Sequence, residues 1–287
     1  MPFPLRSTSL NALHQGRLRG KTITMEQFAV VLEQYQPPAA DKLAFFFQAI
    51  CGLPKLDAMT KAARATGIVV ERVDWEVAQK LQLALGNQQC PARIVPQALV
   101  PTTVKGRRVQ WVAADAGQFS VRWTLTGAID FHPWSDVLVI SAGVVCHTAQ
   151  EQVIKTVEHY GVSGGGRLRT EYSTEIGKRD VSRDMAMATI TLGRKPQELQ
   201  TLRFRAPELE YATMLGEENM QPSSLQNFCL VLARIGMHAT SAHITDETIE
   251  LIAAANATPR LPKSPRFESE EEFDHYQRWL VTRALSN

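Results

Sequence analysis

The residues that come closest to a catalytic motif lie around Ser163. The run Gly161-Val162-Ser163-Gly164-Gly165 fits G-x-S-x-G, the pattern in which hydrolases present a nucleophilic serine on a sharp strand-to-helix turn. The polar run Gly166-Arg167-Leu168-Arg169 follows here, and it does not predict the required helix. The same glycines lack the Lys-Ser/Thr pair of a phosphate-binding loop. We therefore expect a glycine-rich loop, and a hydrolase that uses Ser163 is the third hypothesis for function.

A second group that could do chemistry consists of His147, Glu151 and His159. The first two are four residues apart and would share one face of a helix. Zinc needs at least three such ligands, but the chain has no H-E-x-x-H motif and no C-x-x-C pair. All four cysteines stand beside apolar residues, so we expect buried free thiols in a reducing compartment: Cys51, Cys90, Cys146 and Cys229. We predict no metal site, no cofactor and no catalytic residue.

The candidate ligand-binding residues are Lys105, Arg107 and Arg108, which precede the first strand of a predicted β-rich domain. Three further arginines stand at positions that we expect to face outward on strands: Arg122, Arg203 and Arg205. Together these cations could bind a phosphate or a lipid headgroup, and the alternative is a solvated face. Nucleic acid would also require exposed aromatic residues between the cations, but the aromatic residues here stand at inward positions.

Composition narrows the protein class. The chain has 287 residues, enough for two small domains or one large domain with appendages, and 44% hydrophobic residues can supply a core. A net charge of +2 does not favour nucleic acid as a partner. An apolar run of about 18 residues is lacking, so we predict no membrane span. The N-terminus has no apolar segment of the secretory type, and we expect a cytoplasmic protein.

The N-terminal part is predicted to begin with a flexible basic arm, residues 1–23. Thr24 and Gln27 form a plausible capping box, and the apolar residues after them give one helical face. We therefore predict a helix that Pro37-Pro38 ends. The next stretch, residues 39–50, is ambiguous between helix and strand.

Residues 56–95 predict the order helix, strand, helix, strand. Gly67 ends the first helix and Asp74 caps the second. The stretch VVERVDWEVAQKLQLALGNQQCPARIV resembles the C-terminal domain of the bacterial ribosomal stalk protein. In that family the domain docks translation factors through a basic helix. The helix here carries Glu76 and Lys80 but no basic patch, so the resemblance implies shape and not function. We assign residues 24–98 to a helical and small α/β domain.

Residues 107–143 predict a meander of short strands. One strand is indicated by four apolar residues that alternate with polar ones: Phe119, Val121, Trp123 and Leu125. In the preceding strand, three residues are expected to face inward: Val109, Trp111 and Ala113. Asp115 and Gly117 between them predict a tight hairpin turn. Residues 137–140 are continuously apolar, as in a strand covered on both faces, and Trp134 is expected to close the end of the core.

The rest of the chain is predicted as an insertion, a hairpin and helices. Residues 148–185 are polar and mixed and predict a long insertion or hairpin. Residues 188–192 and 202–204 alternate as a strand pair. Helices are expected from Ser224, from Asp246 and from about Ser269. Helix capping and solubility account for the acids of the last helix: Glu270, Glu271, Glu272 and Asp274.

About seven strands followed by a helix is the order of a pleckstrin-homology-like barrel. The segment HPWSDVLVISAG resembles bacterial versions of that fold, and residues 107–236 resemble uncharacterised bacterial proteins in which such a barrel follows a small α/β unit. The resemblance implies an α+β protein: a small N-terminal α/β unit, then an antiparallel PH-like β-barrel with C-terminal helices. We assign residues 99–240 to the β-rich domain, with its insertion near 148–185, and residues 241–287 to a helical extension.

The sequence shows a well-patterned fold without a catalytic constellation. We therefore expect a non-enzymatic protein-interaction or scaffold module, whose partner is another protein and whose exposed edge strand could pair with a peptide. The alternative is a module that binds an anionic ligand, a phosphate or lipid headgroup, through Lys105, Arg107 and Arg108.

Overall fold

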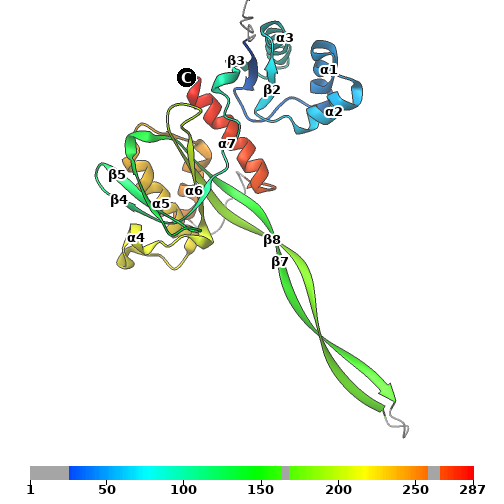
Figure 1. The fold of residues 1–287 in the computed structure, drawn as a ribbon, viewed down its shortest axis with the longest axis vertical. Coiled ribbons are helices and arrows are strands. Elements are labelled where there is room, and N and C mark those ends of the chain that lie inside the picture. Colours follow the sequence, from blue (N-terminus) through cyan, green and yellow to red (C-terminus); the bar gives the residue numbers. More distant parts are fainter. Residues whose placement is uncertain (1–25, 163–167, 258–265) are drawn as a thin grey trace, which may run out of the picture.

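The computed structural model describes residues 26–162, 168–257 and 266–287 (Figure 1). The expected basic arm, residues 1–23, and Ser163 lie outside these ranges. The described chain contains both helices and strands, and the strands form two separate sheets, so the α+β class is confirmed. Short 3₁₀ turns occur at Gln97–Leu99, Trp134–Asp136, Ala206–Glu208 and Glu217–Asn219.

The smaller sheet has three antiparallel strands in the order β2-β1-β3. They are β1 (Phe28–Leu32), β2 (Ile68–Val73) and β3 (Ala92–Pro96). The predicted helix at residues 28–32 is therefore wrong: this run is the central strand, and pairing along both of its edges outweighs the helical spacing of its apolar residues. Its residues alternate between two cores, with Val30 and Leu32 in one and Ala29 and Val31 in the other.

Three helices cover the Val30 and Leu32 face of this sheet: α1 (Ala40–Cys51), α2 (Lys55–Arg64) and α3 (Trp75–Gly86). The ambiguous stretch is helical, and the helix, strand, helix, strand order of residues 56–95 is confirmed. The carboxylate of Asp74 caps α3, because its Oδ1 accepts a hydrogen bond of 2.8 Å from the backbone of Val77.

The larger sheet has eight strands, with β11 placed beside β7 and the others in the order β10-β7-β8-β9-β4-β5-β6. Its strands are β4 (Arg107–Ala114), β5 (Gln118–Trp123), β6 (Ile129–Pro133), β7 (Val137–Val162), β8 (Leu168–Leu192), β9 (Gln200–Arg205), β10 (His243–Ile244) and β11 (Arg266–Phe267). The sheet is open, since its outer strands β6 and β10 do not pair with each other in the described chain. The expected closed barrel is therefore not formed.

Helices cover both faces of the larger sheet at the base of β7. One face packs against α5 (Ser224–His238) and α6 (Asp246–Ala257), with the short α4 (Ala212–Leu215) nearby. The other face packs against α7 (Glu270–Leu285). Burial of residues 137–140 on both sides explains their continuous apolar run, as expected from the sequence.

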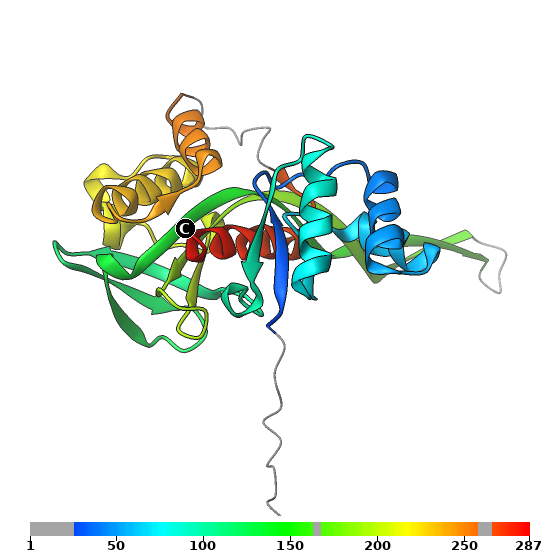
Figure 2. The ribbon, with the colours of Figure 1, turned by 90° about the horizontal axis from the view of Figure 1, so that it is seen from above.

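Helix α7 lies between the two sheets (Figure 2). Its Trp279 is buried and donates a hydrogen bond of 2.8 Å from Nε1 to the backbone oxygen of Leu32. On its other side, Gln277 donates one of 2.5 Å to the Ser141 hydroxyl on β7. The C-terminal segment, which we expected as an extension, thus contributes the core that joins the two sheets.

The aromatic core of the larger sheet agrees with two expectations and corrects two others. Trp134 is buried, stacks on Phe119 and donates a hydrogen bond of 2.9 Å to the backbone oxygen of Asp115. Trp123 is 2% exposed. The prediction that Trp111 faces the core is wrong. A register shift between positions 109 and 111 changes which side chains point to the core, so Val112 is buried and Trp111 is not. Leu125 lies beyond the end of β5 and is 92% exposed.

Replacing Trp123 by alanine is expected to lower the free energy of unfolding by about 3–5 kcal/mol. The change removes a buried ring and the hydrogen bond of 2.6 Å that its Nε1 donates to Asp130. Chemical denaturation of both proteins measures the difference. Trp75→Ala is the control, because Trp75 is 48% exposed and its loss should cost less. Equal effects of the two changes would contradict this assignment of the core.

Candidate functional site

The three basic residues expected to bind an anion do not converge on one point. The Cζ of Arg107 lies 3.9 Å from the centroid of the Trp123 ring, in a cation–π contact. The side chain of Arg108 points to Glu208, with Nη1 and Oε1 3.8 Å apart. Lys105 and Arg108 line one cavity of about 690 Å³ in front of α7, and Arg107 does not.

Arg203 and Arg205 line the same cavity, and their expected outward placement on the solvent side is wrong. They are only 8% and 6% exposed, because α7 covers this face of β9. Arg203 donates to Glu270 at 3.0 Å and also to Asp274, and Arg205 donates to Glu270 and, at 2.8 Å, to Glu208. Capping and solubility are therefore not the whole role of the α7 acids, because Glu270 and Asp274 form a partly buried ion-pair network with β9.

Arginines and carboxylates in this network shift each other's pKa values. Burial raises the pKa of Asp274 despite the neighbouring Arg203, and the charge of Glu270 adds to the rise. Burial lowers the pKa of Arg205, but hydrogen bonds to Glu270 and Glu208 outweigh burial and raise it overall. We conclude that Arg203 and Arg205 hold α7 against the sheet.

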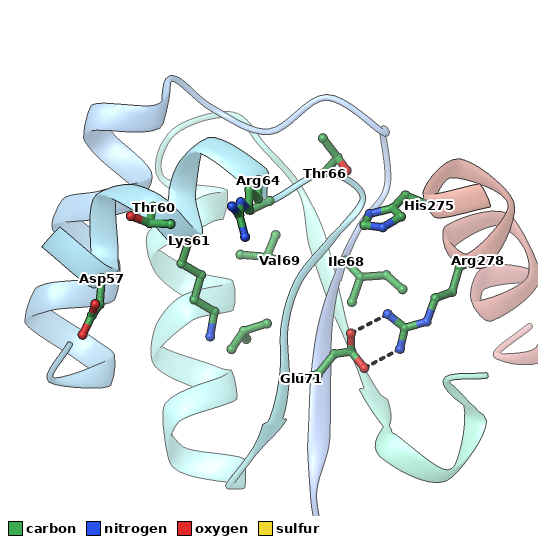
Figure 3. A pocket seen from close by; sticks show the side chains of 12 residues that line it. Asp57, Thr60, Lys61, Arg64, Thr66, Ile68, Val69, Glu71, His275 and Arg278 are labelled. Carbon is green, nitrogen blue, oxygen red and sulfur yellow. Dashed lines mark hydrogen bonds and ion pairs between the residues drawn. The ribbon is translucent and has the colours of Figure 1, made fainter. Parts of the chain in front are cut away.

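A second cavity, of about 520 Å³, lies between α2, β2 and α7 (Figure 3). Lys61 and Arg64 reach it from α2, and His275 and Arg278 reach it from α7. Arg278 forms two hydrogen bonds with Glu71, at 2.6 and 2.5 Å. Burial raises the pKa of Glu71, but the hydrogen bonds and charge of Arg278, with smaller contributions from Gln97 and Arg72, outweigh burial and hold the pKa below its ordinary value. This cavity could not be predicted from the sequence, since its residues come from segments more than 200 positions apart.

The most distinctive surface is the hairpin of β7 and β8, which extends away from the rest of the chain (Figure 1). We call the paired residues 147–162 and 168–183 the arm. At its base, β10, β11 and β9 pair with β7 and β8, but none of these pairs extends beyond Val145 or Met187. Within the arm, the described strands pair only with each other, from His147–Arg183 to Val162–Leu168. The predicted insertion is thus a two-stranded ribbon.

Two isoleucines stand opposite each other in the arm. Ile154 pairs with Ile176, and both side chains are 70% exposed. Directly opposed residues of antiparallel strands point to the same face, so these side chains form one apolar spot. Exposed charged residues of both signs, Glu158 and Lys178, stand on the same face, and the exposed Lys155 stands on the opposite face. The arm therefore presents an apolar centre with charged surroundings to solvent.

The other candidate chemistry is not assembled in the described residues. His147 and Glu151 lie on a strand and not on a helix, so their backbones are roughly 13 Å apart, too far for one metal ion. No group of His, Cys, Asp or Glu side chains within the described ranges could hold a metal. The four cysteines are free thiols, but only Cys229 is fully buried, and burial raises its pKa to about 12.

No family model, no curated protein and no solved structure matches this chain. Within the described ranges, the helices lack the combination of length and apolar character needed to cross a membrane.

Proposed function

We propose that this protein is a non-enzymatic interaction module that binds another protein through the arm. The observation that carries the proposal is a long ribbon in which the two strands have only each other as partners within the described chain. At about 3.3 Å per residue, residues 147–162 span roughly 50 Å. An arm of this length can contact a partner protein that does not touch the two sheets and their helices.

The stability of two-stranded ribbons supports this proposal. An isolated hairpin in water is at best marginally stable, and a third strand or a packed helix is normally required. In the described chain, such support ends at the base of the arm, where β9, β10 and β11 pair. A partner that covers the face of Ile154 and Ile176 would supply the missing packing, and their burial would favour binding.

The free edge of the larger sheet is a less favourable docking surface. Strand β6 is only five residues long, and it ends at Pro133, which cannot donate a ladder hydrogen bond. Ile129 and Phe131 on this strand are exposed, at 49% and 63%, so the edge does offer apolar surface, but its short length limits the ladder hydrogen bonds that a partner strand could form. The expected pleckstrin-homology-like relationship remains a prediction, and the proposal does not depend on it.

Replacing both Ile154 and Ile176 by threonine is expected to weaken partner binding by about tenfold or more. Threonine keeps the β propensity and the cross-strand pairing but removes apolar surface. Leu125→Thr is the matched control, because Leu125 is 92% exposed and lies outside the arm. The measurement is the amount of partner that copurifies with tagged protein from its own source.

The proposal requires a stoichiometric partner on the wild-type protein and on Leu125→Thr. If the partner is a second copy of this chain, the mass of the complex identifies it. Equal recovery by all three proteins, or no partner on the wild-type protein, would contradict the proposal.

A further inference from the structure

We infer that the cavity between α2, β2 and α7 binds a small phosphate monoester. This inference is independent of the arm and concerns a different part of the molecule (Figure 3). The cavity holds about 520 Å³, within the range of about 300–1,000 Å³ that is typical of small-molecule sites.

Side chains with nitrogen donors face the cavity from two sides. Lys61 and Arg64 are three positions apart on α2, and His275 and Arg278 are three positions apart on α7, so each pair shares one helix face. Figure 3 shows the two pairs on opposite sides of β2. An anion between the helices would thus meet nitrogen donors from both.

Among the described residues, no acid lies within ion-pair distance of the two α2 cations. None of the ion pairs in the described part of the chain includes Lys61 or Arg64, whereas Arg278 is paired with Glu71. The Nζ of Lys61 lies 5.3 Å from the centroid of the Phe47 ring on α1. This cation–π contact favours one position of the Lys61 side chain. Asp57 also lines the cavity, at the end away from α7 (Figure 3). This arrangement differs from the cavity at Arg203 and Arg205, where acids bind the cations directly.

The floor of the cavity is apolar. Ile68, Val69 and Val70 of β2 line it, together with Ala65. The hydroxyl of Thr66 lies at its edge (Figure 3). A ligand with an apolar body could therefore lie over β2 while its charged end reaches Lys61 and Arg64.

A phosphate monoester fits these features better than a single carboxylate. It carries a charge of about −1.5 to −2 at neutral pH and has three acceptor oxygens. Lys61 and Arg64 together supply two positive charges and several N–H donors, which form strong hydrogen bonds to phosphate oxygens. Both a free phosphorylated metabolite and a lipid headgroup with a terminal phosphate carry this phosphate monoester group.

Phenyl phosphate is the probe for the first experiment, and phenol, which lacks the phosphate, is its control. Calorimetric titration of the full chain should show one site for phenyl phosphate and none for phenol. Lys61→Gln and Arg64→Gln should each raise the Kd by about tenfold. Lys55→Gln is the matched control, because it removes the same charge from α2 at an exposed position outside the cavity. Arg64 is exposed, so Arg64→Gln tests binding without disturbing the fold.

A second experiment distinguishes the source of the phosphate. Cosedimentation with vesicles that contain phosphatidic acid tests a lipid headgroup, and vesicles of phosphatidylcholine are the control. The inference is supported if either phosphate probe binds the wild-type protein and if its affinity is lower for Lys61→Gln and Arg64→Gln but unchanged for Lys55→Gln. No binding to either probe, or binding that all three variants keep equally, would overturn it.

Discussion

Arg203→Ala is expected to lower the free energy of unfolding at neutral pH by about 3 kcal/mol or more. The Arg203 side chain is 9% exposed and binds both Glu270 and Asp274 on α7. Its removal leaves the partly buried Asp274 without its hydrogen-bonded cation and with only the more distant charge of Lys105, whereas Glu270 keeps Arg205. A buried charge without a partner costs more than the ion pair contributes, so the loss falls mainly on Asp274. Chemical denaturation measures the effect.

The pH dependence identifies the cause. The pKa of Asp274 is already above its ordinary value in the wild-type protein because of burial, and loss of Arg203 should raise it further. A carboxyl group with a raised folded pKa binds its proton more tightly in the folded state, so stability increases as the pH falls toward the unfolded value of 3.8. The destabilisation by Arg203→Ala should therefore shrink in acid.

Asp274→Asn in the Arg203→Ala background provides the control for this explanation. It removes the charge, so the double variant should recover part of the stability at neutral pH. A defect that is the same at all pH values, with no recovery in the double variant, would show that Arg203 acts only through packing.

Removal of the arm is expected to abolish partner binding while the fold is kept. Residues 149–181 can be replaced by Asn-Gly, because Thr148 and Ser182 are directly paired and a two-residue turn can join them. Among the hairpin side chains that the structure describes, the buried ones lie at the base, up to Val145 and from Met185 onward. The melting temperature should therefore stay close to that of the wild-type protein.

Copurification measures the loss of the partner from the trimmed protein. The expected result is a folded chain that recovers essentially none of it. A trimmed protein that still binds would place the interaction on another surface, such as the edge of β6.

Elements held together by neighbouring residues were predictable from the sequence. Asp74 and the apolar stripe of α3, the hairpin of β4 and β5, and the capped helices α5 and α7 all depend on spacing within a few residues. The failure at β1 has a different cause. Its residues Phe28–Leu32 have helical spacing, but their pairing partners begin at Ile68 and Ala92, and this long-range pairing decides the outcome.

The sites were less predictable because they depend on what covers each face. Alternation correctly separates the two faces of β9, but it does not show that α7, at least 65 positions later, covers the face of Arg203 and Arg205. The arm was expected as a long insertion or hairpin, and its polar and mixed strands give no core pattern that would fix their register. The pairing of Ile154 with Ile176 becomes visible only when the register is known.

The most direct test of the proposed function is photocrosslinking from the arm inside the source cells. A photoreactive residue at position 176 should form one discrete crosslink to a partner protein, because Ile176 is exposed on the arm. The same residue at position 125, which is more exposed but outside the arm, should form none. A crosslink from position 125 alone, or from neither position, would contradict the account.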